Sequence, residues 1–465
     1  MILEQIVARN QSDRRRIAVL DDDPTGSQCV HDVSVVTTVD ADAIAAGLSA
    51  PASTCFVLTN TRALDEAEAV ARTRDAARAV LTLGLDGPVD LVSRSDSTLR
   101  GHVLAEADAI ADVYEQETGH AVDGIVFCPA MMEAGRTTRN DIHYARVAGE
   151  DIPVGDTEFA GDTTFGYRSS NLRDFLREKS GDESIPVSSI ALDTIRTGGV
   201  DAVAALLREA SGRQWIVVNA TEYADLETVV LAIRTVQSEG RHFVFRSGPS
   251  LVRPLAGLSG TQPLIGPEIP ARTGLGLHGL IAVGSHVGLT SRQVARAAEL
   301  GGISTVEIDV PTVLGDGRDE HLADVVRRIR EGLAAADMLV YTSRTLVTAE
   351  DPSASLALSV RVSNALVSVV KAVRDAPAWV VAKGGITSHE VAVDALGIRR
   401  ARVVGQFLPG QISLLEPVEA PGDVMGTPYV VFPGNVGGDD ALAIVITVMR
   451  DATRPDPHEL EGDTA

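Results

Sequence analysis

Residues 15–28 have the sequence RRIAVLDDDPTGSQ, and this stretch decides how the rest of the chain is interpreted. Its apolar part, residues 17–20, is short and ends in three aspartates, which is the pattern of a buried strand that reaches a polar edge. The Pro–Thr–Gly segment that follows favours a turn. In proteins with parallel sheets, ligands bind beyond the carboxyl ends of the strands, so we expect chemistry directly after this strand.

The same alternation of short apolar runs and helical patterns continues along the chain, which predicts parallel βαβ units. In the first half, the apolar runs lie at residues 53–60, 88–96, 123–130, 214–220 and 241–248. In the second half, they lie at residues 279–285, 336–342, 378–385, 401–407 and 428–435. We therefore expect an α/β fold with two domains, each a largely parallel sheet flanked by helices.

An interval rich in proline and glycine, residues 249–278, separates the two halves. It predicts an interdomain linker at residues 263–276, with a first domain at 1–262 and a second at 277–454. The polar segment 455–465 is predicted to be a flexible tail.

Composition excludes several classes of protein. The 465-residue chain has a formal net charge of −23, which argues against a nucleic-acid-binding protein because such proteins carry a basic face. No apolar run reaches the length of about 18 residues that a membrane span needs. The three cysteines show no CxxC spacing, which indicates a reducing compartment and no structural zinc. We expect a cytoplasmic protein with no nucleic-acid or membrane partner.

The first candidate motif is the acidic turn at residues 21–28. Adjacent carboxylates repel one another, so this run needs cations, water or hydrogen-bond donors around it. Such a group suits polyol binding, metal binding or base catalysis. The alternative interpretation is a solvated turn that caps a helix.

A second motif, SRSDSTLRGH at residues 93–102, lies between a predicted strand and a predicted helix. At a helix N-terminus, the free N–H groups and the helix dipole favour an anion. Arginine adds bidentate contacts to a carboxylate or phosphate, and Arg62 after the preceding strand is placed to join the same rim. Ordinary helix capping by Ser97 or Thr98 is the alternative.

Further polar or glycine-rich segments also follow predicted strands. Residues 129–138 contain Glu133 and are followed by His143, although an isolated histidine in a loop more often has a structural role than a catalytic one. In the second half, glycine lets backbone N–H groups approach a phosphate closely, and simple turns are the alternative. These loops lie at residues 284–286, 383–388, 407–410 and 433–440.

Together these motifs resemble those of the four-carbon acid sugar kinases over nearly the whole chain. In the first half, the family motifs DDxTG, KxDSTLRG, PA…GRT…H and TEFAxD match residues 22–26, 94–101, 129–143 and 157–162. In the second half, GS…T…Q, GGxT and PG match residues 284–293, 384–387 and 409–410. Two places differ from the family pattern. Arg94 occupies a lysine position, and the loop at 432–437 lacks the Lys–Ser pair of the family's KSGNFG-like loop.

The resemblance implies an ATP- and Mg²⁺-dependent phosphotransferase with an alcohol group as acceptor, in which a substrate-binding and a nucleotide-binding domain enclose an interdomain cleft. The expected catalytic residues are Asp22, Asp23 and Asp96. The expected substrate-binding residues are Thr25, Gly26, Arg62, Arg94, Ser97, Thr98, Arg100, Arg136 and His143. The expected nucleotide-binding residues are Ser285, Gly384, Gly385, Ile386, Thr387, Gly410, Gly434 and Gly437. The metal ligands are not identified.

The resemblance also implies a small acid sugar as substrate, such as erythronate, threonate or an oxo-tetronate. The departures from the family pattern, and a chain somewhat longer than is typical, leave room for a branched oxo acid such as 3-oxo-isoapionate. Two other functions remain open. A metal-dependent hydrolase or aldolase acting on a sugar acid would work without ATP, and a non-catalytic sugar-acid sensor would bind its ligand without turnover. A homodimer is a possible assembly.

Overall fold

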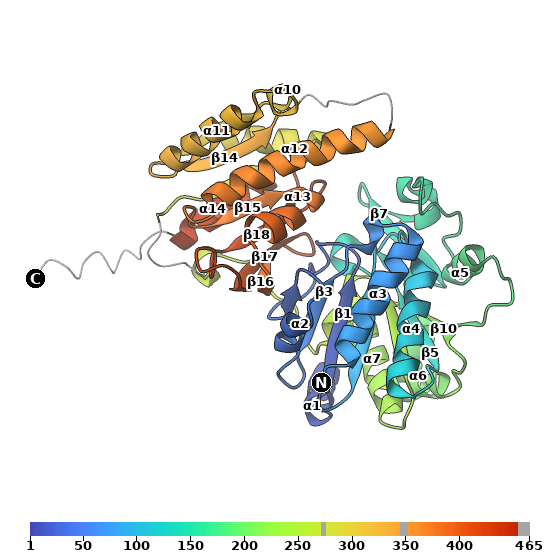
Figure 1. Ribbon diagram of the computed structural model, residues 1–465. Coiled ribbons are helices and arrows are strands. Elements are labelled where there is room, and N and C mark those ends of the chain that lie inside the picture. Colours follow the sequence, from blue (N-terminus) through green and yellow to red (C-terminus); the bar gives the residue numbers. More distant parts are fainter. Residues whose placement is uncertain (271–275, 345–351, 454–465) are drawn as a thin grey trace, which may run out of the picture. The chain divides into compact units, whose positions relative to one another are not determined.

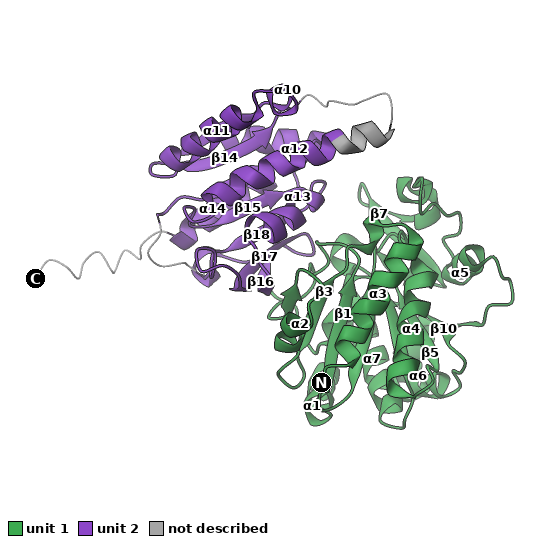
Figure 2. Cartoon of the chain, viewed as in Figure 1, with its two compact units in different colours: residues 1–261 green, residues 262–465 purple. Residues whose placement is uncertain are grey.

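The structure, a computed structural model, describes residues 1–270, 276–344 and 352–453. The predicted tail at 455–465 and residues 271–275 of the predicted linker lie outside these ranges. The chain divides into two compact units, Met1–Thr261 and Gln262–Ala465 (Figure 2). Each unit contains a sheet flanked by helices (Figure 1), so the expected α/β fold is confirmed.

Unit 1 is built on a parallel sheet with the strand order β2-β3-β1-β4-β11-β5-β10-β9. Its strands are β1 (Arg16–Asp21), β2 (Ser34–Val36), β3 (Thr54–Leu58), β4 (Val89–Arg94), β5 (Gly124–Cys128), β9 (Val187–Ile190), β10 (Gln214–Val218) and β11 (Phe243–Ser247). Its helices are α1 (Ile2–Ser12), α2 (Ala41–Gly47), α3 (Glu66–Leu81), α4 (Val103–Thr118), α5 (Leu172–Ser180), α6 (Gly199–Arg208), α7 (Tyr223–Gln237) and α8 (Pro249–Leu255).

Strand β1 is buried along its whole length, as its apolar run predicts. It lies between β3 and β4, and its parallel register with β4 sets Asp21 opposite Arg94. The carboxyl ends of these strands therefore bring the acidic turn and the SRSDSTLRGH segment to the same edge of the sheet. Clusters of buried apolar side chains hold this edge in place, with Ile110 of α4 in one cluster and Phe127 of β5 in another.

The segment that contains His143 is a small antiparallel sheet and not the loop that we expected. Strands β6 (Thr137–Arg139), β7 (Ile142–Val147) and β8 (Glu150–Pro153) form it in that order. Polar and charged residues alternate irregularly here, so the sequence gives no clear period of two. The hairpin follows β5 and brings His143 close to the end of β4.

Unit 2 contains a sheet with the order β13-β14-β12-β15-β18-β17-β16. The strands from β13 to β18 in this order pair in parallel, whereas β17 pairs antiparallel with both β18 and β16. Its strands are β12 (Leu280–Val283), β13 (Ile303–Ile308), β14 (Asp337–Thr342), β15 (Val380–Lys383), β16 (Arg400–Leu408), β17 (Ile412–Glu419) and β18 (Tyr429–Phe432). Its helices are α9 (Gly288–Ala298), α10 (Val310–Leu314), α11 (Arg318–Gly332), α12 (Pro352–Val373), α13 (Gly385–Glu390) and α14 (Ala441–Thr453).

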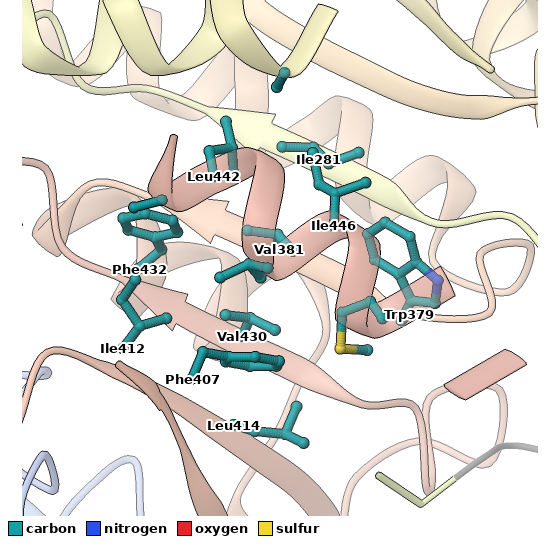
Figure 3. Packing of buried hydrophobic residues seen from close by; sticks show 14 of the residues in the cluster. Ile281, Trp379, Val381, Phe407, Ile412, Leu414, Val430, Phe432, Leu442 and Ile446 are labelled. Carbon is teal, nitrogen blue, oxygen red and sulfur yellow. The ribbon is translucent and has the colours of Figure 1, made fainter. Parts of the chain in front are cut away.

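The core of unit 2 lies between helix α14 and the sheet (Figure 3). Leu442 and Ile446 of α14 pack in one cluster with Trp379, Val381 and Val430. This packing fixes the carboxyl ends of β12, β15 and β18, which the glycine loops follow. Within the described part of the chain, no helix is both long and apolar enough to cross a membrane.

Candidate functional site

Arg94 neutralises part of the negative charge of the acidic turn at residues 21–28. The Nε of Arg94 donates to Oδ1 of Asp21 at 2.6 Å, and its Nη2 donates to the backbone oxygen of Asp23 at 3.2 Å. Both side chains of the Asp21–Arg94 pair are buried, and burial raises the pKa of Asp21 to about 7. Gly26 lies directly on this pair, where any side chain would collide with the carboxylate of Asp21. Arg94 and Gly26 thus shape the turn.

Arg62, which lies in a short helical turn after β3, holds the next two aspartates. Its Nη2 and Nε donate to the two oxygens of Asp22 at 2.6 and 3.1 Å, and its Nη1 donates to Asp23 at 3.0 Å. The other oxygen of Asp23 accepts from the backbone N–H of Thr25 at 2.8 Å and from the Thr25 hydroxyl. Burial opposes ionisation of Asp23, but Arg62 and Arg94 outweigh it and lower its pKa. Burial prevails at Asp22 and raises the pKa of that carboxyl.

Asp96 has one carboxylate oxygen in use and one open. Its Oδ2 accepts from Nε of Arg100 at 2.7 Å and from the hydroxyl of Thr98. Its Oδ1 accepts no hydrogen bond from any described residue, and its side chain is 12% exposed. Burial opposes ionisation of Asp96, but Arg62 and Arg100 outweigh it and lower its pKa. Asp96 is therefore an ionised carboxylate that can accept one more hydrogen bond.

Arg136 is a cation without a carboxylate partner. It forms no ion pair with any described residue, its Nη1 donates to the backbone oxygen of Ala134 at 2.9 Å, and its buried Nε has no partner. Its guanidinium lies over the ring of Phe159 at 5.9 Å, and Arg100 lies over the same ring at 5.5 Å. Burial, together with the positive charge of Arg100, lowers the pKa of Arg136. Such a group favours an incoming anion.

His143 supports the turn that carries Ser97 and Thr98, which lies before helix α4. Because α4 begins at Val103 with His102 as its N-cap, the alternative that Ser97 or Thr98 caps this helix is wrong. Its ring is completely buried, and burial lowers its pKa to about 4. Nε2 donates to the backbone oxygen of Ser97 at 2.8 Å, so Nδ1 accepts from the hydroxyl of Thr138 at 2.9 Å. Tyr167 donates to the backbone oxygen of Thr98 at 2.7 Å. The ring therefore has no spare nitrogen in this arrangement, and the expected contact with substrate stays a prediction.

A second cluster around Glu133 was largely missed by sequence reasoning. Glu133 accepts from the hydroxyl of Tyr223 at 2.6 Å, from the thiol of Cys29 at 3.2 Å and from the hydroxyl of Ser250 at 3.3 Å. Cys29 ends the segment that begins with the acidic turn, so this cluster fixes that segment at its far end. Ser250 shortly follows β11, which is the one signal that could have drawn attention to it.

In unit 2, three loops meet at the carboxyl ends of β12, β15 and β18. Lys383 at the end of β15 is fully buried, and its ammonium donates to the backbone oxygen of Pro433 at 2.9 Å. Burial lowers the pKa of Lys383 to about 7. Thr290 donates to the backbone oxygen of Gly434 at 3.0 Å and lies 3.1 Å from the hydroxyl of Ser285. The lysine therefore ties the loops together.

Glycines occupy key positions in these loops. Gly384 has φ 128°, and a Cβ atom on it would lie 2.9 Å from Oγ1 of Thr387. Gly385 follows as the first residue of α13, and the side chain of Ile386 is 73% exposed. A surface of backbone and small side chains lets phosphates approach the backbone N–H groups closely. The residues expected to bind a nucleotide thus fit such a ligand at this edge of the sheet.

The remaining predicted glycines lie one loop further along. Gly410 forms the turn between β16 and β17. The neighbouring Gln411 accepts from the backbone N–H of Gly437 at 2.9 Å. Gln293 of α9 donates to the backbone oxygens of Val436 and Gly438 at 3.0 and 2.8 Å. These contacts join Gly410 and Gly437 to the loop that begins with Gly434.

The described residues contain no group of three or more His, Cys, Asp or Glu side chains that could hold a metal ion. Magnesium in phosphoryl-transfer sites usually needs only one or two carboxylates, because substrate phosphates and water supply the other ligands. The residues present are therefore compatible with a magnesium ion held mainly by phosphates, and they identify no ligand of their own.

Comparisons with known proteins also find two domains in this chain. A family model of a sugar-binding N-terminal domain matches residues 17–255, and a model of a nucleotide-binding C-terminal domain matches residues 280–442. The chain is 24% identical to a D-erythronate kinase of Heliobacterium modesticaldum over 416 residues, which cover 84% of this chain and 86% of that one. It is 29% identical to a D-threonate kinase of Salmonella typhimurium over 242 residues. That match covers 52% of this chain and about half, 51%, of the relative.

Solved structures share the fold. A Haemophilus influenzae protein aligns with a TM-score of 0.67 at 17% identity, over 93% of this chain and 100% of the other. A Salmonella typhimurium protein described as a putative tRNA synthase aligns with the same TM-score and identity, over 92% of this chain and 98% of the other. At such identities the likeness concerns the fold alone.

Proposed function

Because the chain belongs to the four-carbon acid sugar kinase family, we propose that it transfers the γ-phosphoryl group of ATP to a hydroxyl of a small acid sugar. The observation that carries the proposal is the cation of Arg136, which lacks a carboxylate partner among the described residues and interacts electrostatically with Asp96. A guanidinium beside an open carboxylate oxygen suits a ligand that has both an acid group and a hydroxyl. Acid sugars such as threonate and erythronate have this combination.

In the proposed complex, Arg136 and Arg100 hold the substrate carboxylate. The ring of Phe159, which both guanidinium groups overlie, keeps their charges close together. Ser97 and Thr98 offer backbone N–H groups in the turn before α4, and His143 holds that backbone in place. The carboxylate thereby receives charge-assisted hydrogen bonds, which are the stronger kind.

We assign the role of orienting the attacking hydroxyl to Oδ1 of Asp96. Both oxygens of Asp22 and of Asp23 already accept hydrogen bonds from Arg62 or Thr25, whereas Oδ1 of Asp96 is open. The low pKa of Asp96 makes it a weak base, but phosphoryl transfer depends mainly on positioning and on stabilising charge. Asp22, Asp23 and Arg94 then act by shaping the turn, and Arg62 by clamping its aspartates.

The nucleotide is proposed to bind at the loops of unit 2. The loops that begin at Ser285, Gly384 and Gly434 would hold its phosphates, with Gly410 and Gly437 at the outer end. When bound, Mg²⁺ neutralises charge on the phosphate oxygens. Lys383 contributes indirectly, because its ammonium is engaged by the loop that contains Gly434. The interdomain cleft, the cytoplasmic location and the homodimer expected from the sequence stay predictions.

The experiment that tests the proposal is a coupled ADP-release assay with ATP and Mg²⁺ against a panel of acid sugars. The panel contains threonate, erythronate, an oxo-tetronate and the branched 3-oxo-isoapionate, with the corresponding uncharged polyols as controls. We expect turnover on an acid and none on its uncharged counterpart. A reaction on a sugar acid that proceeds equally without ATP would instead support a hydrolase or aldolase. Binding without any turnover would support a sensor.

A further inference from the structure

Unit 2 contains a cavity of about 220 Å³ that none of the predicted motifs fills. It borders the phosphate loops at Gly284 and Thr387 and extends under helix α12. Its walls come from the ends of β12 and β14, from the start of α10, and from α12 and α13. The cavity therefore opens next to the place proposed for the phosphates and leads away from it.

Most of the wall is apolar. Its apolar members are Val310, Leu358, Val360, Val362, Leu366 and Ile386. Two of them, Val360 and Ile386, are 48% and 73% exposed, so the wall presents large apolar side chains that the chain itself does not cover. Apolar walls with a few convergent polar groups are the usual lining of a small-molecule pocket. A flat aromatic ring system would cover these side chains.

Glu390 is the acidic group of this cavity. The hydroxyl of Ser363 on α12 donates to its Oε2, which fixes the carboxylate, while its Oε1 accepts no hydrogen bond within the described ranges. Burial raises the pKa of Glu390, which agrees with a carboxyl turned toward a cavity and not toward water. On the other side of the cavity, His286 lies 3.3 Å from the hydroxyl of Thr342. A carboxylate with one open acceptor thus lines a largely apolar cavity.

We propose that this cavity holds the purine base of the nucleotide and that Glu390 selects adenine over guanine. The amino group at C6 of adenine is a hydrogen-bond donor and would meet the open oxygen of Glu390. Guanine has a carbonyl oxygen at C6, so two acceptors would face each other in a buried site. Leaving buried polar groups unpaired in this way is what gives a site strong discrimination. The inference rests on the proposed function and adds the nucleobase to it.

The test is calorimetric titration of the full chain with ADP, IDP and GDP, without any acid sugar. Hypoxanthine, the base of IDP, has a carbonyl at C6 and a proton on N1 but lacks the extra amino group of guanine, so it tests the C6 edge without a mutation. We expect wild-type protein to bind ADP at least 10-fold more tightly than IDP or GDP. Equal affinities, or no binding of any of the three, would overturn the inference.

The variant Glu390→Gln tests the residue itself. A side-chain amide can donate to a carbonyl as well as accept from an amine, so the ratio of ADP to IDP affinity should fall about 10-fold. Asp394→Asn is the matched control, because Asp394 lies on the next turn, is exposed and does not line the cavity. It should leave the ratio unchanged. If Glu390→Gln lowers the affinities for ADP and IDP equally, Glu390 has a merely structural role and the inference is contradicted.

Ile386→Ala separates the apolar wall from the polar contact. The substitution should lower the affinities for ADP and for IDP by a similar factor, about 3- to 10-fold, and leave the ratio of the two affinities unchanged. A changed ratio would mean that selection does not depend on Glu390. If the titrations succeed while no acid sugar is phosphorylated, the nucleobase assignment stands and the proposed reaction fails, so the two failures are distinguishable.

Discussion

The two units use different chemistry at the same place in their sheets. In unit 1, the carboxyl ends of β1, β3 and β4 carry aspartates and arginines that are tied to one another in buried pairs. In unit 2, the ends of β12, β15 and β18 carry glycine and hydroxyl side chains, and the one lysine among them bonds to backbone oxygens. The charged side chains of unit 1 are thus suited to recognise the charge and hydroxyls of a ligand. The glycine loops of unit 2 are suited to let the backbone fit closely around a ligand.

The difference also concerns what remains unsatisfied. Burying a charge is costly unless it is paired, and in unit 1 nearly every charge at the site has a partner. The exceptions among the described residues include Arg136, one oxygen of Asp96 and the buried Oδ2 of Asp21. The proposed ligand contacts fall at Arg136 and Asp96, because Asp21 lies beneath the turn and is completely buried. In the described part of unit 2, the open groups that line the cavity are an apolar wall and one oxygen of Glu390.

The largest effect is expected from Asp96→Asn. This change keeps the shape of the side chain but removes the negative charge that orients the attacking hydroxyl, so kcat should fall about 100- to 1,000-fold. ADP affinity, which depends on unit 2, should stay the same. Steady-state kinetics and ADP titration measure the two quantities. Asp23→Asn should cost less in kcat and more in thermal stability. Near-normal turnover in Asp96→Asn with loss in Asp23→Asn would transfer the role to Asp23.

Arg136→Met should raise KM for the acid sugar about 10- to 100-fold, because charge-assisted hydrogen bonds contribute on the order of 1.5–3 kcal/mol. The kcat value should change much less. Arg139→Met is a matched control on the same hairpin, since Arg139 pairs with Asp151 at 3.2 Å and lies over the ring of Tyr144. Equal effects of the two substitutions on KM would remove Arg136 from the carboxylate site.

His143 predicts a pH dependence that belongs to unit 1. Its pKa is about 4 in the folded protein and roughly 6.5 when unfolded. The free energy of folding that depends on a neutral His143 is therefore fully present above pH ~6.5 and is lost as the pH falls toward 4. Between pH ~7.5 and ~4.5, wild-type protein should lose roughly 2 kcal/mol more unfolding free energy than His143→Gln. Denaturant unfolding at the two pH values measures this, and parallel losses would refute it.

The smallest effect is expected from Gly384→Ala in unit 2. A Cβ atom at φ 128° is strained and approaches Thr387, so stability should fall by on the order of 1 kcal/mol and ADP affinity about 10-fold. Affinity for the acid sugar should not change. Gly422→Ala, where a Cβ would meet no atom within 4 Å, is the control. Thermal melts and ADP titration provide the data, and unchanged ADP affinity would exclude this loop from the phosphate site.

The sequence predicts well which residues lie at the strand ends, and predicts poorly the features that depend on contacts between distant segments. Asp22, Arg62 and Asp96 lie directly after apolar runs, so the rule that ligands bind beyond the ends of parallel strands brings them together. The hairpin around His143 was missed because its polar residues show no period of two. The cavity beside Glu390 was missed because half of its wall comes from the middle of α12, where apolar residues at helical spacing predict ordinary core packing.

The division of labour between the two units is the central claim, and one set of titrations tests it most directly. Wild-type protein, Arg136→Met and Gly384→Ala are each titrated with ADP and with the acid sugar that the turnover assay identifies. We predict that Arg136→Met loses affinity for the acid alone and that Gly384→Ala loses affinity for ADP alone. Loss of ADP binding in Arg136→Met, or loss of acid binding in Gly384→Ala, would contradict the account.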